Sequence, residues 1–421
     1  MKKIMFFGGI VVALVVIGAL FGPRAIEPPR RSPAVPENLT GRAVIPGIPG
    51  ARYFVGLDLE PLVRDALAAR QREIEFRARS GLTSDLPPAE MLAISGGGDK
   101  GAFGAGLLYG WTQAGTRPTF KVVTGVSTGA LIAPFAFLGS DYDEVLKQVY
   151  TSITPADIAS PRSFIAAVGN DGMADNAPLW SLIARFVDQD LLDQIAAEHA
   201  KGRILLVGTT NLDARQPVIW NMGVIASSDA PQALELFRSI LLASAAIPGA
   251  FPPTMISVEV DGQPYQEMHV DGGASTQVFL YPPALRQTAA SLGEQMSRQG
   301  RVYVIRNSSF TATWDPVVRQ TISIAARAID SLIHTQGIGD LFRIYLTTQQ
   351  DGLDFNLAYI DRDFVYENKK EQFENAFMVK LFDYGQQLSR AGYPWRKTPP
   401  GFSTPVGGAP AAAAAPPTSG Q

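Results

Sequence analysis

Apolar residues along this chain alternate between short runs that suit buried strands and longer stretches with the spacing of an amphipathic helix. A strand, a glycine-rich turn and a helix follow one another twice within Met91–Leu138. This repetition favours an α/β domain with a mostly parallel sheet. The pattern predicts strands at Met91–Ile94, Val122–Thr124, Arg203–Thr210, Pro217–Asn221, Met255–Val260, Tyr265–Val270, Arg301–Arg306 and Leu341–Thr347.

The helical pattern and the composition also suggest how the chain is divided. Helices are expected at Leu57–Arg79, Ala102–Gln113, Asp141–Tyr150, Pro178–Val187, Leu191–Ala200, Leu234–Ala246, Pro283–Arg298, Asp315–His334 and Glu367–Leu388. The expected parts are an N-terminal membrane segment (1–22), a Pro-rich linker (23–56), an amphipathic helical extension (57–89), a main domain (90–285), a C-terminal α/β extension packed on it (286–395) and a low-complexity tail (396–421).

The first 22 residues are typical of a segment that enters a membrane. Lys2 and Lys3 precede an uncharged, strongly apolar run from Ile4 to Gly22. A cleaved signal peptide has an apolar region of about 7–15 residues, and a spanning helix needs about 20. The length of the run favours an uncleaved anchor over a cleaved signal, and basic residues on both sides leave its orientation open. We therefore expect a protein of the bacterial cell envelope, membrane-anchored by its N-terminus or exported.

The composition excludes several kinds of function. The formal net charge of −3 argues against binding of nucleic acid. The absence of cysteine excludes disulfides, thiolate nucleophiles and zinc–thiolate sites. His199, His269 and His334 are the three histidines of the chain, so a histidine-rich metal site is not expected. The sequence indicates neither a metal nor a cofactor.

The stretch from Lys121 to Leu138 has the pattern of a nucleophile elbow. Gly125-Val126-Ser127-Thr128-Gly129 follows a β-branched run and precedes an apolar helical stretch. The two glycines allow a sharp turn that exposes the serine hydroxyl, and the helix directs its positive end at an oxyanion formed there. Because the pentapeptide also occurs as an ordinary strand-to-helix turn, its context has to decide.

A second glycine-rich turn, Ser95–Gly101, follows the first expected strand. Its alternating glycines match the formal dinucleotide-binding fingerprint, but the next strand leads into Ser127 instead of an acidic residue that would hold a ribose. The other interpretation is a loop whose backbone N–H groups bind a developing oxyanion. Lys100 adds positive charge there, and Asp99 is expected to face away.

Asp271 and the two glycines that follow it end another expected strand. Such a turn is common for structural reasons alone. Active sites in open α/β sheets lie outside the carboxyl ends of strands, where Ser127 and the glycine-rich loop are also expected. Asp271 is therefore a candidate member of a shared site.

These motifs, in this order, resemble those of the patatin-like phospholipase family. The resemblance covers Glu90–Gly273 and includes Ala243–Gly249 with the following Phe251-Pro252-Pro253, which looks like the segment that this family has before its aspartate. It implies a three-layer α/β/α sandwich around a mostly parallel sheet, with the catalytic domain at 90–285. It also implies a serine lipid acyl hydrolase of phospholipase A or lysophospholipase type, which acts on a lipid or phospholipid and needs no cofactor.

The resemblance assigns a role to each motif. Carried over by position, Ser127 is the nucleophile and Asp271 is the base of a Ser-Asp dyad without histidine. The loop residues assigned to the oxyanion hole are Gly96, Gly97, Gly98, Lys100 and Gly101, the elbow glycines are Gly125 and Gly129, and the Asp-Gly-Gly motif adds Gly272 and Gly273.

Other interpretations stay open. An α/β-hydrolase-type esterase would use Ser127, Asp271 and His334 as a triad, although a histidine in an amphipathic helix is more often a surface or packing residue. A membrane-tethered scaffold would keep the fold without turnover. His269 shares a strand face with Asp271 and is expected to be structural, and His199 is expected to be exposed.

Overall fold

The computed structural model describes residues 31–56, 59–83, 85–163, 170–294, 298–311, 314, 316–367 and 369–402. The expected membrane segment (1–22) lies outside these residues, as does the tail from residue 403 onward. Among the described helices, none combines the length and the apolar character needed to cross a membrane.

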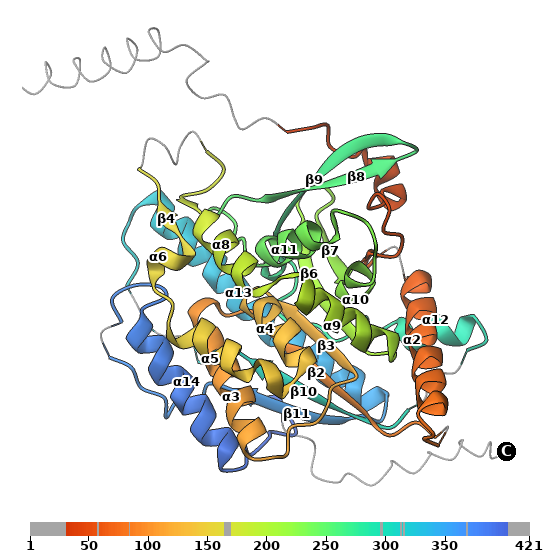
Figure 1. The fold of residues 1–421 in the computed structure, drawn as a ribbon. Coiled ribbons are helices and arrows are strands. Elements are labelled where there is room, and N and C mark those ends of the chain that lie inside the picture. Colours follow the sequence, from red (N-terminus) through yellow and green to blue (C-terminus); the bar gives the residue numbers. More distant parts are fainter. Residues whose placement is uncertain are drawn as a thin grey trace, which may run out of the picture.

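One sheet of nine strands among the described residues carries the fold (Figure 1). Its main path runs in the order β1 (Arg52–Phe54), β7 (Gln216–Asn221), β6 (Ile204–Asn211), β3 (Val122–Val126), β2 (Ala89–Ile94), β10 (Gly300–Arg306) and β11 (Asp354–Tyr359). A hairpin of β8 (Thr254–Val260) and β9 (Gln263–Asp271) is attached to β6. The pairs from β6 to β11 are parallel, and the remaining pairs are antiparallel. The prediction of a mostly parallel sheet is confirmed.

Alternate residues of each strand face two different helical layers. On β2, Leu92 and Ile94 belong to the largest core cluster, whereas Met91 and Ala93 belong to a second cluster on the other face. Figure 1 shows α3, α4 and α14 in front of the sheet and α13 crossing behind it. The expected three-layer α/β/α sandwich is therefore confirmed.

The helices of the two layers pack into different core clusters. The first core cluster includes residues of α3 (Gly101–Gln113), α4 (Thr128–Leu138), α5 (Asp143–Thr151), α8 (Ala177–Phe186), α9 (Gln189–Ala200), α10 (Met222–Ala226), α11 (Ala233–Ser244) and α14 (Asn375–Arg390). The other face is covered by α2 (Leu59–Arg79), α12 (Leu285–Ser291) and α13 (Thr321–Gln350). Helix α4 is apolar on every side and is almost wholly buried, as expected for a helix without a polar face.

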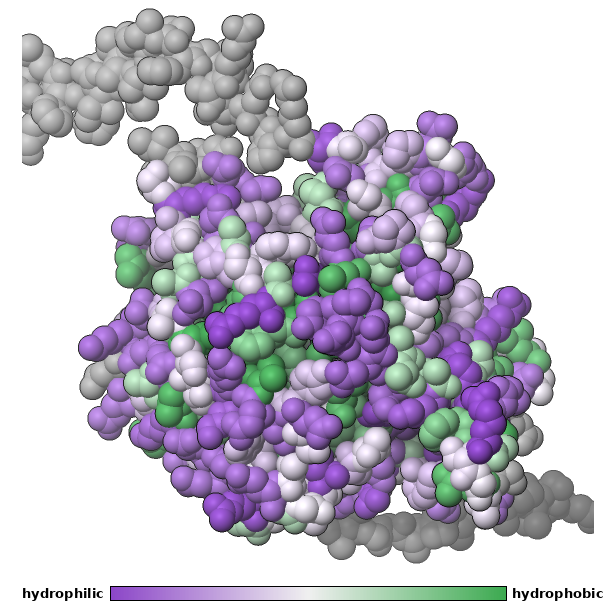
Figure 2. Space-filling model, in the orientation of Figure 1, coloured by the Kyte–Doolittle hydropathy of each residue, from purple (hydrophilic) through white to green (hydrophobic). Residues whose placement is uncertain are grey.

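The surface of the front face is mainly hydrophilic. Figure 2 shows one hollowed, apolar patch near its middle, in the area where Figure 1 places α4, α8 and α11. Apolar residues elsewhere on this face are scattered among hydrophilic ones, which is usual for a folded protein.

The region after β10 differs most from the sequence-based expectation. The prediction of a strand at Leu341–Thr347 is wrong, because these residues continue α13, which runs unbroken from Thr321 to Gln350. Leu341, Ile344 and Tyr345 are spaced as a helical face and pack into the second core cluster. A short, mainly apolar run fits both a strand pattern and a helix pattern, which explains the error.

The strand that pairs with β10 comes later than predicted. It is β11, over Asp354–Tyr359, and the sequence pattern did not indicate it. Two expected helices are shorter than predicted, with α12 ending at Ser291 and α14 beginning at Asn375.

Residues 31–56, which the composition assigns to a linker, pack on the main body. Val35, Ile45 and Ile48 are buried in the largest core cluster, and Val44 forms a bridge to Glu259 on β8. Strands β10 and β11 of the expected C-terminal extension share the sheet with β2. The described parts of the chain are therefore more closely integrated than the composition suggests.

Candidate active site

Ser127 occupies a strained turn between β3 and α4. Its backbone angles are φ 56° and ψ −127°, in a region that residues other than glycine rarely adopt. A Cβ on Gly125 would collide with the carbonyl group of Gly129, and a Cβ on Gly129 would collide with that of Ile94. Both elbow glycines are therefore required for this turn, as the motif predicts.

Ser244 on α11 holds the strained serine in place. The N–H of Ser127 donates to the Ser244 hydroxyl at 3.0 Å, and this hydroxyl donates to the carbonyl oxygen of Gly208 on β6 at 2.7 Å. Ser244 is fully buried. Sequence reasoning identified the segment Ala243–Gly249 but assigned no role to the side chain of Ser244.

The register of the sheet brings Asp271 to Ser127. Strand β3 pairs with β6 up to the partners Val126 and Gly208. The antiparallel β9 pairs with β6 from the next position onward, where Asp271 lies opposite Thr209. The last residues of β3 and β9 therefore meet end to end along β6.

The carboxyl group of Asp271 is almost fully buried, with 4% of the residue exposed. It accepts a hydrogen bond from the N–H of Gly273 at 2.7 Å and another from the hydroxyl of Ser127. Burial raises the pKa of Asp271 to about 6, although both hydrogen bonds act in the opposite direction. Such a carboxylate is ionised at neutral pH and is a stronger base than an exposed one.

Two backbone N–H groups of the glycine-rich loop are candidate donors to an oxyanion. Those of Gly96, Lys100 and Gly101 are already bonded to carbonyl oxygens. Those of Gly97 and Gly98 have no hydrogen-bond acceptor among the contacts of the described residues. Of the five residues expected at the oxyanion hole, three have N–H groups that are already bonded. Gly97 and Gly98 are the two whose N–H groups can still donate to a ligand.

The loop passes directly beside Ser127. A Cβ on Gly96 would lie 3.1 Å from the Cβ of Ser127, and a Cβ on Gly97 would collide with the backbone of Asn307. Gly98 has a φ of +59°, which favours glycine. Only glycine at these positions lets the loop approach Ser127 so closely.

Asn307 and Ser95 fix this loop to the end of β10. The side-chain amide of Asn307 donates to the carbonyl oxygen of Ser95 at 2.9 Å and accepts from the N–H of Gly104 at 3.0 Å. Its own N–H donates to the Ser95 hydroxyl at 2.9 Å. Sequence reasoning missed Asn307, although its place at the carboxyl end of a parallel strand was a usable signal.

Gln277 joins the loop to the Asp-Gly-Gly turn and to α13. Its carbonyl oxygen accepts from the N–H of Gly96 at 3.1 Å, and its own N–H donates to Asp340 at 2.7 Å. Its side chain fills the space beside Gly96 and Gly273. Sequence reasoning also missed this residue, a buried amide that directly precedes an apolar run.

The charged residues of the loop differ in exposure. Asp99 is buried, forms an ion pair with Lys369 and accepts a hydrogen bond from the N–H of Phe373 at 2.8 Å. Its negative charge is therefore neutralised by the segment that follows β11. Lys100 is exposed as a residue, but partial burial of its ammonium group lowers its pKa.

Residues 92–282 match the model of a protein family described as patatin-like phospholipase. This domain belongs to the patatin-like phospholipase family. Among solved structures, VipD from Legionella pneumophila is similar at 12% identity and a TM-score of 0.33, over 73% of this chain and 67% of that one. Human GIVD cytosolic phospholipase A2 is similar at 9% identity and a TM-score of 0.31, over 77% of this chain and 53% of that one. No curated protein sequence matches the chain.

His334 lies on α13, outside the part of the chain that matches the family model. It is half-buried, and burial lowers its pKa, with a further contribution from the charges of Arg306 and Lys100. The described contacts of the Asp271 carboxyl group include Ser127 and Gly273 but not His334. These contacts offer no support for the triad interpretation.

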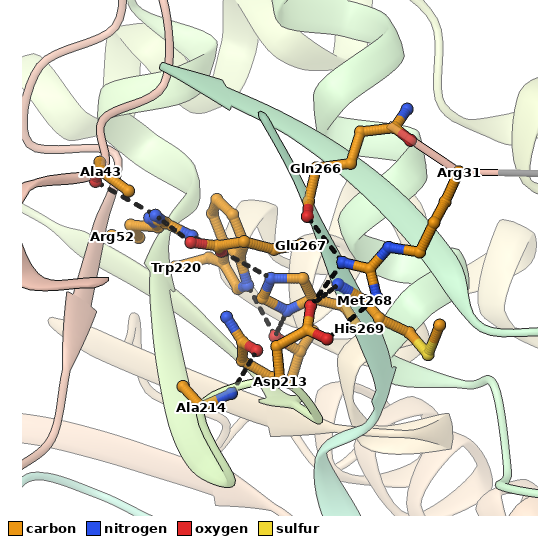
Figure 3. Close-up of polar contacts among 12 residues, drawn as sticks. Arg31, Ala43, Arg52, Asp213, Ala214, Trp220, Gln266, Glu267, Met268 and His269 are labelled. Atoms are coloured by element: carbon orange, nitrogen blue, oxygen red, sulfur yellow. Dashed lines mark hydrogen bonds and ion pairs between the residues drawn. The ribbon is translucent and has the colours of Figure 1, made fainter. Parts of the chain in front are cut away.

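His269 belongs to a separate buried network of the patatin-like domain (Figure 3). Its Nε2 lies 3.1 Å from a carboxylate oxygen of Glu267, and its Nδ1 lies 2.9 Å from the hydroxyl of Thr209. That hydroxyl also accepts from the indole N–H of Trp220 at 2.8 Å. Burial lowers the pKa of His269, so the neutral ring joins these groups, in keeping with the structural role expected for it.

His199 is buried, so the prediction that it is exposed is wrong. Its ring packs against Gly223 of α10, where a Cβ would collide with it. Burial lowers the pKa of His199 to about 4. Charged neighbours in the sequence indicated exposure, but α9 turns this residue toward α10.

An apolar cavity of about 250 Å³ lies between β6, β7, the segment 275–283 and α13, and a second of about 180 Å³ shares residues with it; Ser127 and Asp271 line neither cavity. The first is lined by Val126 and Gly272, the chain neighbours of Ser127 and Asp271. Both cavities share Leu280 and Tyr281, so they form one apolar region under α13 and α2.

Proposed function

We propose that this protein hydrolyses carboxylic esters of lipids, as a phospholipase A or lysophospholipase, through an acyl-enzyme on Ser127. The observation that carries the proposal is the hydrogen bond between Ser127 and the buried Asp271, beside two unbonded N–H groups, in a patatin-like domain. A nucleophile, a base and oxyanion donors are the minimum required for acyl transfer.

In the first half of the reaction, Asp271 accepts the proton of the Ser127 hydroxyl while Oγ attacks the ester carbonyl carbon. The negative charge that develops on the carbonyl oxygen is stabilised by the N–H groups of Gly97 and Gly98 and by the N-terminal end of α4. The carbon–oxygen bond to the alcohol then breaks, and Asp271 returns the proton to the leaving oxygen.

In the second half, a water molecule takes the place of the alcohol. Asp271 accepts a proton from this water, and the resulting hydroxide attacks the acyl carbon bound to Ser127. The acyl–serine bond breaks, Ser127 recovers its proton, and a fatty acid is released. The same carboxylate thus serves as base in both halves, which requires it to stay close to Ser127 throughout.

Two further features support an acyl substrate. The apolar cavities beside Val126 and Gly272 offer space of the kind that a hydrocarbon chain fills. The pKa of Asp271, near 6, allows it to be ionised between turnovers and to accept a proton during them.

The proposal includes a location at the bacterial cell envelope, either anchored through residues 1–22 or exported. The apolar run behind Lys2 and Lys3 is its support. Fractionation of cells that express the full chain, with and without residues 1–22, tests it. Equal recovery of both forms in the cytosol would contradict it.

A serine-directed fluorophosphonate and a lipid product analysis test the chemistry. The full-length wild type is expected to be labelled and to release fatty acid from phospholipid, lysophospholipid or glyceride. Ser127→Ala should lose both properties, and Ser291→Ala, an exposed serine on α12, should keep both. Absence of labelling and of hydrolysis in every lipid and detergent would favour a scaffold without turnover.

A further inference from the structure

Arg306, the last residue of β10, is buried without a hydrogen-bond partner. Only 3% of the residue is exposed. Its Nε is fully enclosed and has no acceptor, and its two Nη atoms donate to no described residue either. A guanidinium carries five N–H donors and normally satisfies most of them when it is buried. The donors of Arg306 are therefore left for a group that is not part of the described chain.

The contacts of Arg306 do not neutralise its charge. Its guanidinium lies over the ring of Phe310, 5.1 Å from the ring centre. The charge of Asp340 acts on Arg306 from beyond ion-pair distance. The carboxylate of Asp340 instead accepts the N–H of Gln277 at 2.7 Å and pairs with Arg343 at 3.3 Å. Burial lowers the pKa of Arg306 to about 10, so the group is still a cation at neutral pH.

Arg306 lies one side chain away from Ser127. A Cβ on Gly337 of α13 would lie 2.8 Å from Nη1 of Arg306 and 3.2 Å from the Cβ of Gln277. At the far end of that glutamine, a Cβ on Gly96 would lie 2.6 Å from Oε1 of Gln277 and 3.1 Å from the Cβ of Ser127. The side chain of Gln277 thus extends from the surroundings of Arg306 to those of Ser127. A small molecule that spans the same length can contact both residues.

The other charges in this region are close to balance. Burial lowers the pKa of His334, and the charges of Arg306 and Lys100 lower it further, whereas Asp330 acts in the opposite direction. Asp99 and Asp330 likewise raise the pKa of Lys100 against the effect of burial. A general positive field is therefore not what distinguishes this region. The distinguishing feature is a single buried cation whose donors have no acceptor.

We propose that Arg306 binds the phosphodiester of a phospholipid while Ser127 attacks an ester of the same molecule. A planar guanidinium presents two parallel N–H groups, which match two oxygens of a phosphate. In a phospholipid the phosphate and the acyl esters are attached to one glycerol, so the phosphate lies a few bonds from the carbon that is attacked. The position of Arg306, one glutamine side chain from Ser127, fits this separation.

The inference narrows the class of substrate and rests on the proposed function. Phospholipids and lysophospholipids carry the phosphodiester, and neutral glycerides do not. A site with a buried polar group discriminates against a substrate that leaves this group unpaired. The wild type should therefore prefer the phosphate-bearing ester. Inorganic phosphate offers the same anionic oxygens, so the experiments have to distinguish a headgroup from free phosphate.

Two soluble esters that differ only in the headgroup test the inference. Dibutyroyl phosphatidylcholine and dibutyroyl glycerol carry the same acyl groups, and the ratio of their kcat/KM values measures the preference for phosphate. In full-length protein, Arg306→Gln should lower this ratio at least about tenfold, because a charge-assisted hydrogen bond is lost. Arg306→Lys should keep part of the preference, since it keeps a positive charge.

The matched control is Arg301→Gln, which changes an exposed arginine at the other end of β10. It should leave the ratio unchanged. An unchanged ratio in folded Arg306→Gln would overturn the inference. If that variant does not fold, a wild type without preference for the phosphate-bearing ester would overturn it equally.

Inhibition of the wild type distinguishes the two sources of phosphate. Glycerophosphocholine should inhibit hydrolysis of dibutyroyl glycerol competitively, and glycerol at the same concentration should not. Absence of inhibition by glycerophosphocholine would contradict the inference. Equal inhibition by inorganic phosphate, in an enzyme without preference for the phosphate-bearing ester, would assign Arg306 to free phosphate and refute the headgroup assignment.

Direct binding separates this inference from the proposed function. Isothermal titration calorimetry with glycerophosphocholine needs no turnover, so it can be done with Ser127→Ala. Binding that is lost in Ser127→Ala/Arg306→Gln would support the role of Arg306, and equal binding by both variants would refute it. Absence of hydrolysis of both esters by the wild type would refute the proposed function alone. Hydrolysis of both esters at a ratio that does not depend on Arg306 would refute this inference alone.

Discussion

Two buried carboxylates on β9 have opposite properties. Glu267 and Asp271 are four residues apart on the same strand face and are 1% and 4% exposed. Burial acts against ionisation of Glu267, but hydrogen bonds from His269 and Arg52 hold its pKa at about 2. Burial raises the pKa of Asp271 to about 6, because its partners are a neutral hydroxyl and one N–H. A cationic partner at one position and none at the other accounts for the difference.

This comparison separates a structural carboxylate from a candidate base. The ion pair with Arg52 keeps Glu267 ionised under all physiological conditions, so it cannot exchange protons usefully. Asp271 keeps an affinity for the proton because nothing positive neutralises it. The cost is a buried charge that destabilises the folded state at neutral pH, a cost typical of functional sites.

The largest expected effect concerns turnover. Asp271→Asn should lower kcat/KM for ester hydrolysis about 10³–10⁴-fold, because an amide cannot accept the serine proton. Glu267→Gln should lower it less than about tenfold in protein that remains folded. Steady-state hydrolysis of a soluble ester measures both. Similar losses of kcat/KM in the two variants would contradict the assignment of Asp271 as the base and Glu267 as a structural carboxylate.

The next largest effect concerns stability. Glu267→Ala should lower the free energy of unfolding by about 3–5 kcal/mol, because it leaves the buried charge of Arg52 uncompensated. Urea denaturation measures this change. Glu235→Ala, an exposed glutamate on α11, serves as control and should change it by less than about 0.5 kcal/mol. If Glu267→Ala left the free energy of unfolding nearly unchanged, the ion pair with Arg52 would contribute little to stability.

Asp271→Asn should change the free energy of unfolding in the opposite direction from Glu267→Ala. The folded-state pKa, about 6, lies above the ordinary value of 3.8, so the group favours folding fully below about pH 4 and progressively less as the pH rises through 6. Above pH 7 the substitution removes a buried charge and should stabilise the protein by up to about 3 kcal/mol. Urea denaturation at pH 8 and pH 4 should show the gain at pH 8 alone. A destabilised variant at pH 8 would contradict the assignment.

A smaller effect is expected in the pH profile of the wild type. Because Asp271 must be ionised to act as base, kcat/KM should fall below an apparent pKa of about 6 and be about tenfold lower at pH 5. A short soluble ester avoids effects of pH on lipid surfaces. A fall in kcat/KM that begins only near pH 4 would mean that burial does not raise the pKa of Asp271.

The smallest effect is expected at His334. Since the described contacts of Asp271 do not include it, His334→Ala should change kcat/KM less than about threefold. Ester hydrolysis by this variant and by His269→Ala decides between dyad and triad. Loss of more than about 10²-fold in His334→Ala, with His269→Ala active, would support the triad.

The motifs of the site could be read from the sequence because each is a short, recognisable run of residues. Gly125 is required by a collision within its own turn, whereas Gly129 is required by the backbone of Ile94 and Gly97 by Asn307, in other parts of the chain. Strands in the parallel part of the sheet were also recognisable, since residues buried on both faces form continuous apolar runs.

The supporting contacts could not be predicted because they join distant parts of the chain. Ser244, Gln277 and Asn307 act through hydrogen bonds whose partners depend on how α11, α13 and β10 pack. The sequence also gave no sign that Arg52 would neutralise Glu267, since β1 was expected to be part of a linker. Local pattern therefore indicated the reacting groups, and tertiary packing determined their properties.

The order of strands in the chain has a consequence for the timing of synthesis. Ser127 and the glycine-rich loop are complete once β3 and α4 have emerged from the ribosome, but Asp271 ends a hairpin made much later. Until β9 pairs with β6 beyond Gly208, Ser127 lacks the carboxylate that we propose as its base. If Ser127 and Asp271 act together as proposed, hydrolysis would begin only after nearly two thirds of the chain has been translated.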